Sequence, residues 1–217
     1  IKAVRPLKDG VIADFNAAEE MLKTFIKKCN GGKGILAPRI VIGIPSGVTS
    51  VERKAVREAA LGGAREVYLI DEPVAAAIGA SLPVTEPMGT MIVDIGGGTT
   101  DVAVLSLGGT VVSESLRIAG DEINASISTY LKKNHNMVVG ERTAEKIKMT
   151  IGSAFPDNDF DSTSMEVRGL YLLSGLPRAI NLTAGEIREA MSDPLYKIID
   201  SLKRTLERTP PELAADI

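Results

Sequence analysis

One short stretch of the sequence combines residue types that bind charged groups. Asp94 is followed by Gly96, Gly97 and Gly98, then by two threonines and Asp101, with apolar runs on both sides. Glycines lack a Cβ and can take φ > 0, so a bulky anion can approach their backbone N–H groups. Carboxylates are ligands that Mg²⁺ accepts, often through water. The stretch therefore predicts a phosphate cradle, with Asp94 facing a Mg²⁺ ion and the threonine hydroxyls as additional donors.

The stretch can also be interpreted as a glycine-rich hairpin that merely turns the chain. Its surroundings bear on the choice between the two interpretations. Residues 38–45 and 66–70 are short apolar runs of the kind that form buried strands. Between these runs, Thr49 and Glu52 form the capping-box pair of a helix. Strand, helix and strand in this order predict a parallel α/β layer.

Other segments predict further helices and a linker. Asn16, with Glu19 three residues later, is expected to cap an amphipathic helix, and Pro73 to begin an alanine-rich one. Thr183 is expected to cap another helix, and Pro194 to open a separate one after it. Residues 80–89 have the composition of a linker, and residues 164–183 that of short strands and turns.

The composition limits the classes of protein that remain. A chain of 217 residues that is 44% hydrophobic can bury a substantial core. Its 25 basic and 28 acidic residues give no positive excess, so nucleic acid is not an expected partner. The single cysteine, Cys29, cannot form an intramolecular disulfide, and the single histidine, His135, cannot build a histidine-based metal site. No apolar segment reaches the roughly 18 residues that span a bilayer. A reducing, cytoplasmic setting fits these features best.

The order of motifs resembles that of a known superfamily. The stretch "VIGIPSGVTSVERKAVREAALGGAREVYLIDEPVAAAIGA", followed by "DIGGGTTD", resembles the actin-like ATPase superfamily. Within it, "AVRPLKDGVIADF", "ERTAEKIKMTIGSA" and "TPPELAADI" are similar to the MreB family of bacterial actins. The resemblance runs over essentially the whole chain. It implies an α/β, actin-like ATPase (ribonuclease H-like) fold, with parts of two α/β halves flanking a nucleotide cleft.

The resemblance also implies a domain organisation. Residues 1–85 would belong to the first half, residues 86–125 and 184–217 to the second half, and residues 126–183 to an outer subdomain inserted in the second half. The family's first glycine hairpin and its last glycine motif would lie outside these 217 residues. We therefore expect an internal fragment of an ATP-hydrolysing parent, with an incomplete ATP site of its own.

The family's phosphate and catalytic residues can be matched to this sequence. The resemblance implies that the β- and γ-phosphates of ATP meet four residues of the hairpin: Gly96, Gly97, Gly98 and Thr99. Asp94 would face Mg²⁺. Glu72 would orient the attacking water, with Asp71 able to share that role. Without the resemblance, the sequence favours a different interpretation of Glu72, as a helix N-terminal charge stabilised by the macrodipole.

Two further pairs are candidates for the nucleoside end of ATP. Glu145 and Lys148 lie three residues apart, which predicts a surface ion pair on one helix face. The resemblance implies that they contact adenosine instead. Gly120 and Asp121 occupy the turn before a helix, where a ribose or a metal-bound water could be approached, or where a helix simply starts.

A glycine-rich turn suggests a membrane contact. Ile35 and Leu36 lie in this turn, flanked by basic residues at Lys27, Lys28, Lys33 and Arg39. Apolar side chains inside a basic collar suit insertion into an anionic membrane surface. A loop at this place contacts the membrane in the family that the chain resembles. Alternatively, both side chains begin the next strand and are buried.

The function expected from the resemblance is that of a cytoskeletal actin-like ATPase. It would use ATP and Mg²⁺, and it would form membrane-associated filaments that determine rod shape and guide cell-wall synthesis. Its partners would be other copies of itself, the inner membrane surface and membrane proteins of cell elongation, and it would lie in the cytoplasm at the inner face of the membrane. Two alternatives are a non-catalytic binding fragment and a chaperone-like ATPase of the same superfamily, which the motifs favour less.

Overall fold

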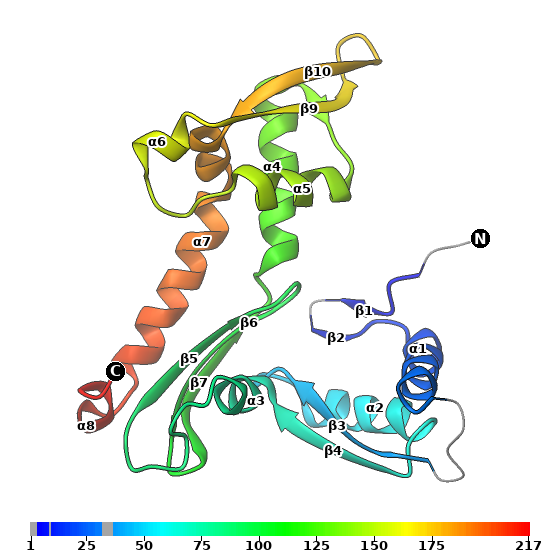
Figure 1. The fold of residues 1–217 in the computed structure, drawn as a ribbon, viewed down its shortest axis with the longest axis vertical. Helices are drawn as coiled ribbons and strands as arrows, with labels where there is room; N and C mark the ends of the chain where they lie inside the picture. The colour runs from blue at the N-terminus through cyan, green and yellow to red at the C-terminus, as the bar shows by residue number, and fades with distance from the viewer. Residues whose placement is uncertain (1–3, 9, 32–36) are drawn as a thin grey trace. The chain divides into compact units, whose positions relative to one another are not determined.

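The computed structural model of the chain describes residues 4–8, 10–31 and 37–217 (Figure 1). The chain forms two compact units. Unit 1 contains residues 1–117 and 201–217, and unit 2 contains residues 118–200. The finer assignment of residues to subdomains stays a prediction.

A parallel pair of strands organises the first part of unit 1. Strands β3 (Arg39–Ile44) and β4 (Glu66–Asp71) are parallel, and helix α2 (Ser50–Leu61) connects them. One core cluster forms where Ala60 and Val67 pack with apolar side chains of the preceding helix. This arrangement confirms the predicted parallel layer. The capping box is also confirmed, because Thr49 accepts from the Glu52 N–H at 3.2 Å and the Glu52 carboxylate accepts from the Thr49 N–H at 2.7 Å.

The helix before this pair starts earlier than predicted. Helix α1 spans Phe15–Cys29, and its N-cap is Asp14, whose carboxylate accepts from the Ala17 N–H at 3.0 Å. The expected cap, Asn16, lies inside the first turn. Both residues are good caps, and the extended backbone at Asp14 decides between them. Two short strands, β1 (Leu7–Lys8) and β2 (Val11–Ile12), precede this helix as an antiparallel pair.

The glycine-rich stretch lies in the second sheet of unit 1. This antiparallel sheet has the order β5 (Thr90–Ile95), β6 (Thr100–Ser106) and β7 (Gly109–Leu116). The central strand β6 is almost wholly buried. Helix α3 (Glu72–Gly79), which begins with Pro73 in its first turn as predicted, packs against it through Ala77, beside Ala103 and Leu105.

Unit 2 packs helices on one face of a small antiparallel sheet. The sheet has the order β10 (Leu176–Thr183), β9 (Ser164–Tyr171) and β8 (Met137–Val138). The helices are α4 (Gly120–His135), α5 (Glu141–Ile151) and the short α6 (Asn158–Asp161). Fully buried residues from these elements and from the start of the next helix, α7 (Ala184–Glu207), form one core: Ile127, Leu131, Ile147, Leu182 and Ile187.

The C-terminal helix corrects another prediction. Helix α7 runs from Ala184 to Glu207 without interruption, so Pro194 lies inside it and does not open a new helix. A proline inside a helix costs about 3 kcal/mol, and packing on both sides of the proline offsets this cost. Met191 and Ile198 are both buried on that helix. The last element, α8 (Pro211–Ala214), follows it in unit 1.

Candidate functional site

The glycine hairpin joins β5 to β6 in unit 1. The Gly96 N–H donates to the Thr99 carbonyl at 2.9 Å and closes the turn. Gly96 and Gly97 are exposed, so the tip of the hairpin offers backbone to solvent without side chains. The left-handed glycines of the described chain are at positions 10, 31, 108 and 175. The expected φ > 0 in this hairpin is therefore wrong, and the property that its exposed glycines offer is the absence of a Cβ.

Two aspartates lie at the base of the hairpin on neighbouring strands. Asp94 and Asp101 are direct cross-strand partners. Asp101 is only 1% exposed, and its Oδ1 accepts from the Ser46 N–H at 2.8 Å. This hydrogen bond ties the second sheet to the loop that follows β3. The role of Asp101 was not foreseen from the sequence, although a carboxylate in an otherwise apolar strand is a detectable signal.

Glu72 extends this group to three carboxylates. It is the first residue of α3, directly after the carboxyl end of β4, and it is half-buried. Burial raises the pKa of Glu72, and the charges of Asp101 and Asp94 raise it further. Burial likewise raises the pKa of Asp101, against the hydrogen bond from Ser46. The structure thus brings the predicted residues Glu72 and Asp94 together around Asp101.

The neighbouring acid takes a different role. Asp71 accepts a hydrogen bond from the Arg53 guanidinium at 2.8 Å. On the other strand, a Cβ at Gly43 would lie 3.1 Å from Cγ of Glu72, so the glycine leaves room for that side chain. Of the two acids considered, Glu72 is therefore the one that faces the other site carboxylates.

The raised pKa of Glu72 predicts a stability change. A carboxyl group with a raised folded-state pKa favours folding while it is protonated, and this contribution is lost as the pH rises above about 4.3 towards the folded pKa. Glu72→Gln removes the penalty, so we expect its melting temperature at pH 7 to rise by roughly 2–4 °C. The increase in melting temperature should become smaller as the pH falls towards 4. Thermal melts of both proteins between pH 4 and pH 7 measure this increase. A lower melting temperature of the variant at pH 7 would contradict a raised pKa of Glu72.

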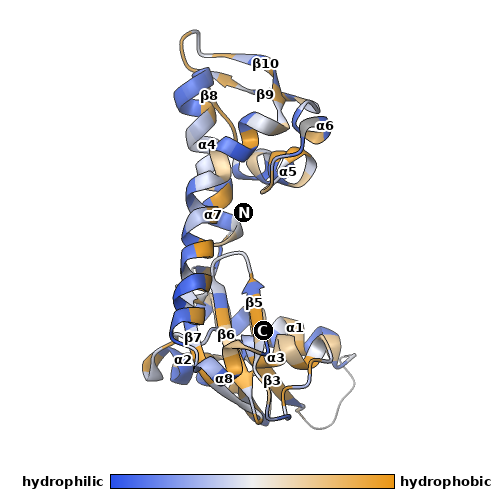
Figure 2. Cartoon of the chain, turned by 90° about the vertical axis from the view of Figure 1, so that its left-hand side faces the viewer, coloured by the Kyte–Doolittle hydropathy of each residue, from blue (hydrophilic) through white to orange (hydrophobic). Residues whose placement is uncertain are grey.

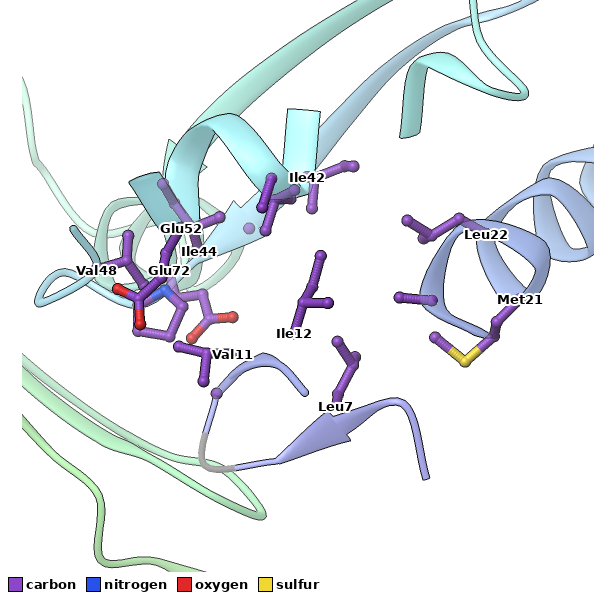
Figure 3. Close-up of a pocket in the computed structure, with 16 residues that line it drawn as sticks. Leu7, Val11, Ile12, Met21, Leu22, Ile42, Ile44, Val48, Glu52 and Glu72 are labelled. Atoms are coloured by element: carbon purple, nitrogen blue, oxygen red, sulfur yellow. The ribbon is translucent and has the colours of Figure 1, made fainter. Parts of the chain in front are cut away.

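A cavity of about 220 Å³ lies beside Glu72 in unit 1. Its wall is mostly apolar and comes from the β1–β2 pair, α1, α2 and β3, through Leu7, Ile12, Met21, Leu22, Ile42 and Val56 among others. Figure 3 shows Glu52 and Glu72 at one end, beside Val48, and Met21 and Leu22 at the other. The catalytic candidate therefore borders an apolar space.

The nucleoside candidates lie in unit 2. Nζ of Lys148 donates to the Gly120 carbonyl at 3.1 Å, which joins two predicted residues. Gly120 is the first residue of α4, and Asp121 lies in its first turn. Glu145 is exposed on α5. Lys148 thus bonds the start of α4, which differs from the surface ion pair that the spacing suggested.

The remaining candidates have separate outcomes. Ile35 and Leu36 lie outside the described residues. Cys29 is exposed and is a free cysteine. Within the described ranges there is no helix whose length and apolar character would let it cross a membrane. The same part of the chain shows no group of three or more His, Cys, Asp or Glu side chains arranged to hold a metal ion directly.

His135 has a partner that the sequence did not reveal. Its Nε2 lies 3.2 Å from Oε1 of Glu186. The other carboxylate oxygen, Oε2, accepts from the Thr183 N–H at 2.8 Å and from the Thr183 hydroxyl at 2.9 Å. Burial raises the pKa of Glu186, but the Thr183 hydrogen bonds and His135 outweigh it, so the net pKa is lowered. One carboxylate thus joins the end of α4 to the start of α7.

This contact predicts a pH-dependent loss of stability. An acid with a lowered folded-state pKa contributes stability above its unfolded pKa of about 4.3, and the contribution is lost as the pH falls through the folded pKa. Glu186→Gln should therefore cost about 1 kcal/mol at pH 7 and progressively less below pH 4. Urea unfolding of both proteins at pH 7 and below pH 4 measures the loss of unfolding free energy. An equal loss at the two pH values would argue against the ionised carboxylate as the cause.

Comparison with solved structures defines the class of the protein. The subunit of the MamK double helical filament superposes with a TM-score of 0.79 at 21% identity, over 98% of this chain and 64% of that one. Spiroplasma citri MreB5 bound to ADP superposes with a TM-score of 0.91 at 39% identity, over 100% of this chain and 64% of that one. The fold is that of an actin-like ATPase.

Sequence comparison defines the family. The MreB/Mbl protein family model matches residues 1–217, and the chain belongs to that family. Cell shape-determining protein MreB of Escherichia coli K12 is 52% identical over 219 residues, which covers 100% of this chain and 62% of that protein. Cell shape-determining protein Mbl of Bacillus subtilis 168 is 49% identical and is covered to 65%. The chain thus spans less than two thirds of the length of these relatives.

Proposed function

We propose that this chain is the greater part of a cytoskeletal ATPase subunit that determines cell shape. The observation that carries the proposal is the open glycine hairpin of unit 1, with Asp94, Asp101 and Glu72 at its base. Such a site combines backbone donors for phosphate with carboxylates for a cation and a water molecule. A relative of this chain, MreB5, is described as bound to ADP in one structure and to AMPPNP in another.

The hairpin would bind the β- and γ-phosphates of ATP. The Gly96 N–H is already donated to the Thr99 carbonyl, so the donors for phosphate would be the N–H groups of Gly97, Gly98 and Thr99 and the Thr99 hydroxyl. The exposed position of Gly97 allows a phosphate to reach the backbone.

Asp94 would hold Mg²⁺ through water. The fit rests on the electrostatics of the site, since three carboxylates lie close enough for Asp94 and Asp101 to raise the pKa of Glu72. A divalent cation would relieve this repulsion, and Mg²⁺ can be held by one or two carboxylates because it keeps much of its water. When bound, Mg²⁺ would neutralise charge that develops on the phosphates.

Glu72 would orient the attacking water, and Asp101 would position the loop beside it. A raised pKa brings the Glu72 carboxylate closer to the range in which it can take up a proton at neutral pH. Asp101 is buried and bonded to the Ser46 N–H, so it would act by fixing the loop after β3. Glu145, Lys148, Gly120 and Asp121 are proposed contacts for adenosine.

Assembly and membrane contact complete the proposal. The subunit would associate with copies of itself into filaments at the inner face of the cell membrane, together with membrane proteins of cell elongation. The chain's similarity to MamK, whose structure is described as a double helical filament, supports the fold on which such assembly would depend. Ile35 and Leu36 are proposed membrane contacts.

Calorimetric titration tests the nucleotide site directly. We expect the chain to bind ATP and ADP in the presence of Mg²⁺, and to bind them more weakly when the cation is removed by a chelator. Bound nucleotide should also raise the unfolding free energy, by about 2.7 kcal/mol at a concentration of one hundred times Kd. No heat and no stabilisation at millimolar Mg·ATP would contradict a functional site in these 217 residues.

A further inference from the structure

A hairpin of unit 2 carries a cluster of exposed leucines at its tip. The cluster, here called the leucine tip, consists of residues at the end of β9, in the β9–β10 loop and at the start of β10: Leu170, Leu172, Leu173 and Leu176. Leu173 is 73% exposed and Leu176 is 64% exposed. Gly175, with φ +68°, turns the chain between them. Figure 2 shows this loop as hydrophobic. Several large apolar side chains gathered at one convex place indicate a contact surface.

Basic residues of α4 and β10 lie near the leucine tip. Strand β8 pairs with the end of β9 at Leu170, and the Leu172 N–H donates to the Asn136 carbonyl at 2.8 Å. These contacts place the last turn of α4, with Lys132 and Lys133, next to the tip. On the adjacent strand, the Arg178 guanidinium lies 4.6 Å from the ring centre of Tyr171.

Two acidic side chains near this surface have partners that the structure places beside them, and a third, Glu189, lies near Tyr130 on α4. Glu166 on β9 lies 3.3 Å from the Arg168 guanidinium, and Glu186 lies 3.2 Å from His135. The Arg168 guanidinium compensates the charge of Glu166, and Lys132, Lys133 and Arg178 add positive charge near the leucines. Apolar side chains inside a basic collar match a surface that is negatively charged outside and apolar beneath.

We propose that the leucine tip inserts into an anionic lipid surface, with Lys132, Lys133 and Arg178 against the lipid headgroups. This assigns a membrane contact to unit 2, at residues far in the sequence from Ile35 and Leu36. The proposal adds a second contact to the membrane association proposed above, and it rests on that proposed function for the kind of partner. Insertion of the leucine tip requires neither bound nucleotide nor the hairpin at residues 96–99. A hairpin tip with exposed leucines and basic residues nearby suits a broad surface of negative charge better than a narrow apolar groove.

Co-sedimentation of the chain with vesicles tests the proposal. The vesicles contain phosphatidylcholine alone or with phosphatidylglycerol at roughly 30%, a content that gives an anionic surface. We expect binding to the anionic vesicles, and a loss of at least about tenfold in partitioning for the double variant Leu173→Glu, Leu176→Glu. Lys132→Ala with Lys133→Ala should weaken binding and reduce its dependence on salt. The control, Leu107→Glu with Ile78→Glu, adds the same two charges in unit 1, because Leu107 is 70% exposed in the turn between β6 and β7 and Ile78 is 56% exposed on α3.

Further variants separate this proposal from the others. Ile35→Glu with Leu36→Glu reports the first membrane candidate, and nucleotide calorimetry reports the ATP site. Equal vesicle binding by the leucine-tip variant and the control variant in unit 1 would overturn the proposal. So would a leucine-tip variant that loses self-association in the absence of lipid while still binding vesicles, since the tip would then be a protein contact. Absence of nucleotide binding by the unsubstituted chain would contradict the nucleotide site proposed in unit 1 and would leave the leucine-tip proposal unaffected.

Discussion

Gly97→Asp is expected to lower the affinity of the chain for Mg·ATP by at least about a hundredfold. The substitution puts a carboxylate at the exposed tip of the hairpin, where the phosphates would approach the backbone. Asp94, Asp101 and Glu72 already place negative charge at the base of this hairpin. At 4 Å, two like charges near a protein surface repel by about 4 kcal/mol, which is more than the expected loss requires.

The control for this experiment is Gly79→Asp. Gly79 is the last residue of α3 and is exposed, and a Cβ placed there would meet no atom within 4 Å. The Gly79→Asp substitution makes the same change of residue and charge in unit 1, outside the hairpin. Calorimetry of both variants and of the unsubstituted chain gives the comparison. Equal affinities of the two variants would show that phosphate does not contact the hairpin at residues 96–99.

Ile147→Ala is expected to destabilise unit 2 by about 2–5 kcal/mol. Ile147 is fully buried on α5, in the core that contains Ile127 and Leu131. Truncation removes three carbon atoms from the hydrophobic core and leaves a cavity that neighbouring side chains fill only in part. Native-state hydrogen exchange of the α4 and α5 amides measures the change in this unit alone.

Met149→Ala is the matched control on the same helix. Met149 is 78% exposed, so its truncation should change stability by no more than about 0.5 kcal/mol. The ratio of the two effects tests the orientation of α5 independently of its helical content. A comparable loss in both variants would mean that α5 does not present Ile147 to the core.

Local features were predictable because they depend on residues close together in the sequence. The Thr49–Glu52 capping box, the parallel strands around it and the hairpin after Asp94 were all present as patterns and are all confirmed. Errors occurred where two local signals competed. Asp14 and Asn16 are both good caps, and α1 begins after Asp14.

Packing overrode local signals elsewhere in the chain. Pro194 is a strong helix boundary by itself, yet α7 continues through it, with Met191 and Ile198 buried on either side. The cost of a proline inside a helix is set by its low intrinsic helix propensity, which is a local property. The burial of apolar side chains that offsets this cost depends on the other elements of the fold. Residue types around the proline therefore could not decide the question.

The sequence by itself determined the family, the main helices and strands, and the glycine hairpin of this protein. Motif order and hydrophobic periodicity are properties of consecutive residues, so they can be recognised without a structure. Only the tertiary structure decided the partners within the site and around it. Asp101 bonds the Ser46 N–H across 55 residues, Asp71 bonds Arg53 instead of joining Glu72, and His135 meets Glu186. A long-range polar contact depends on strand register and on which side chains are buried together, and neither is fixed until the elements have packed.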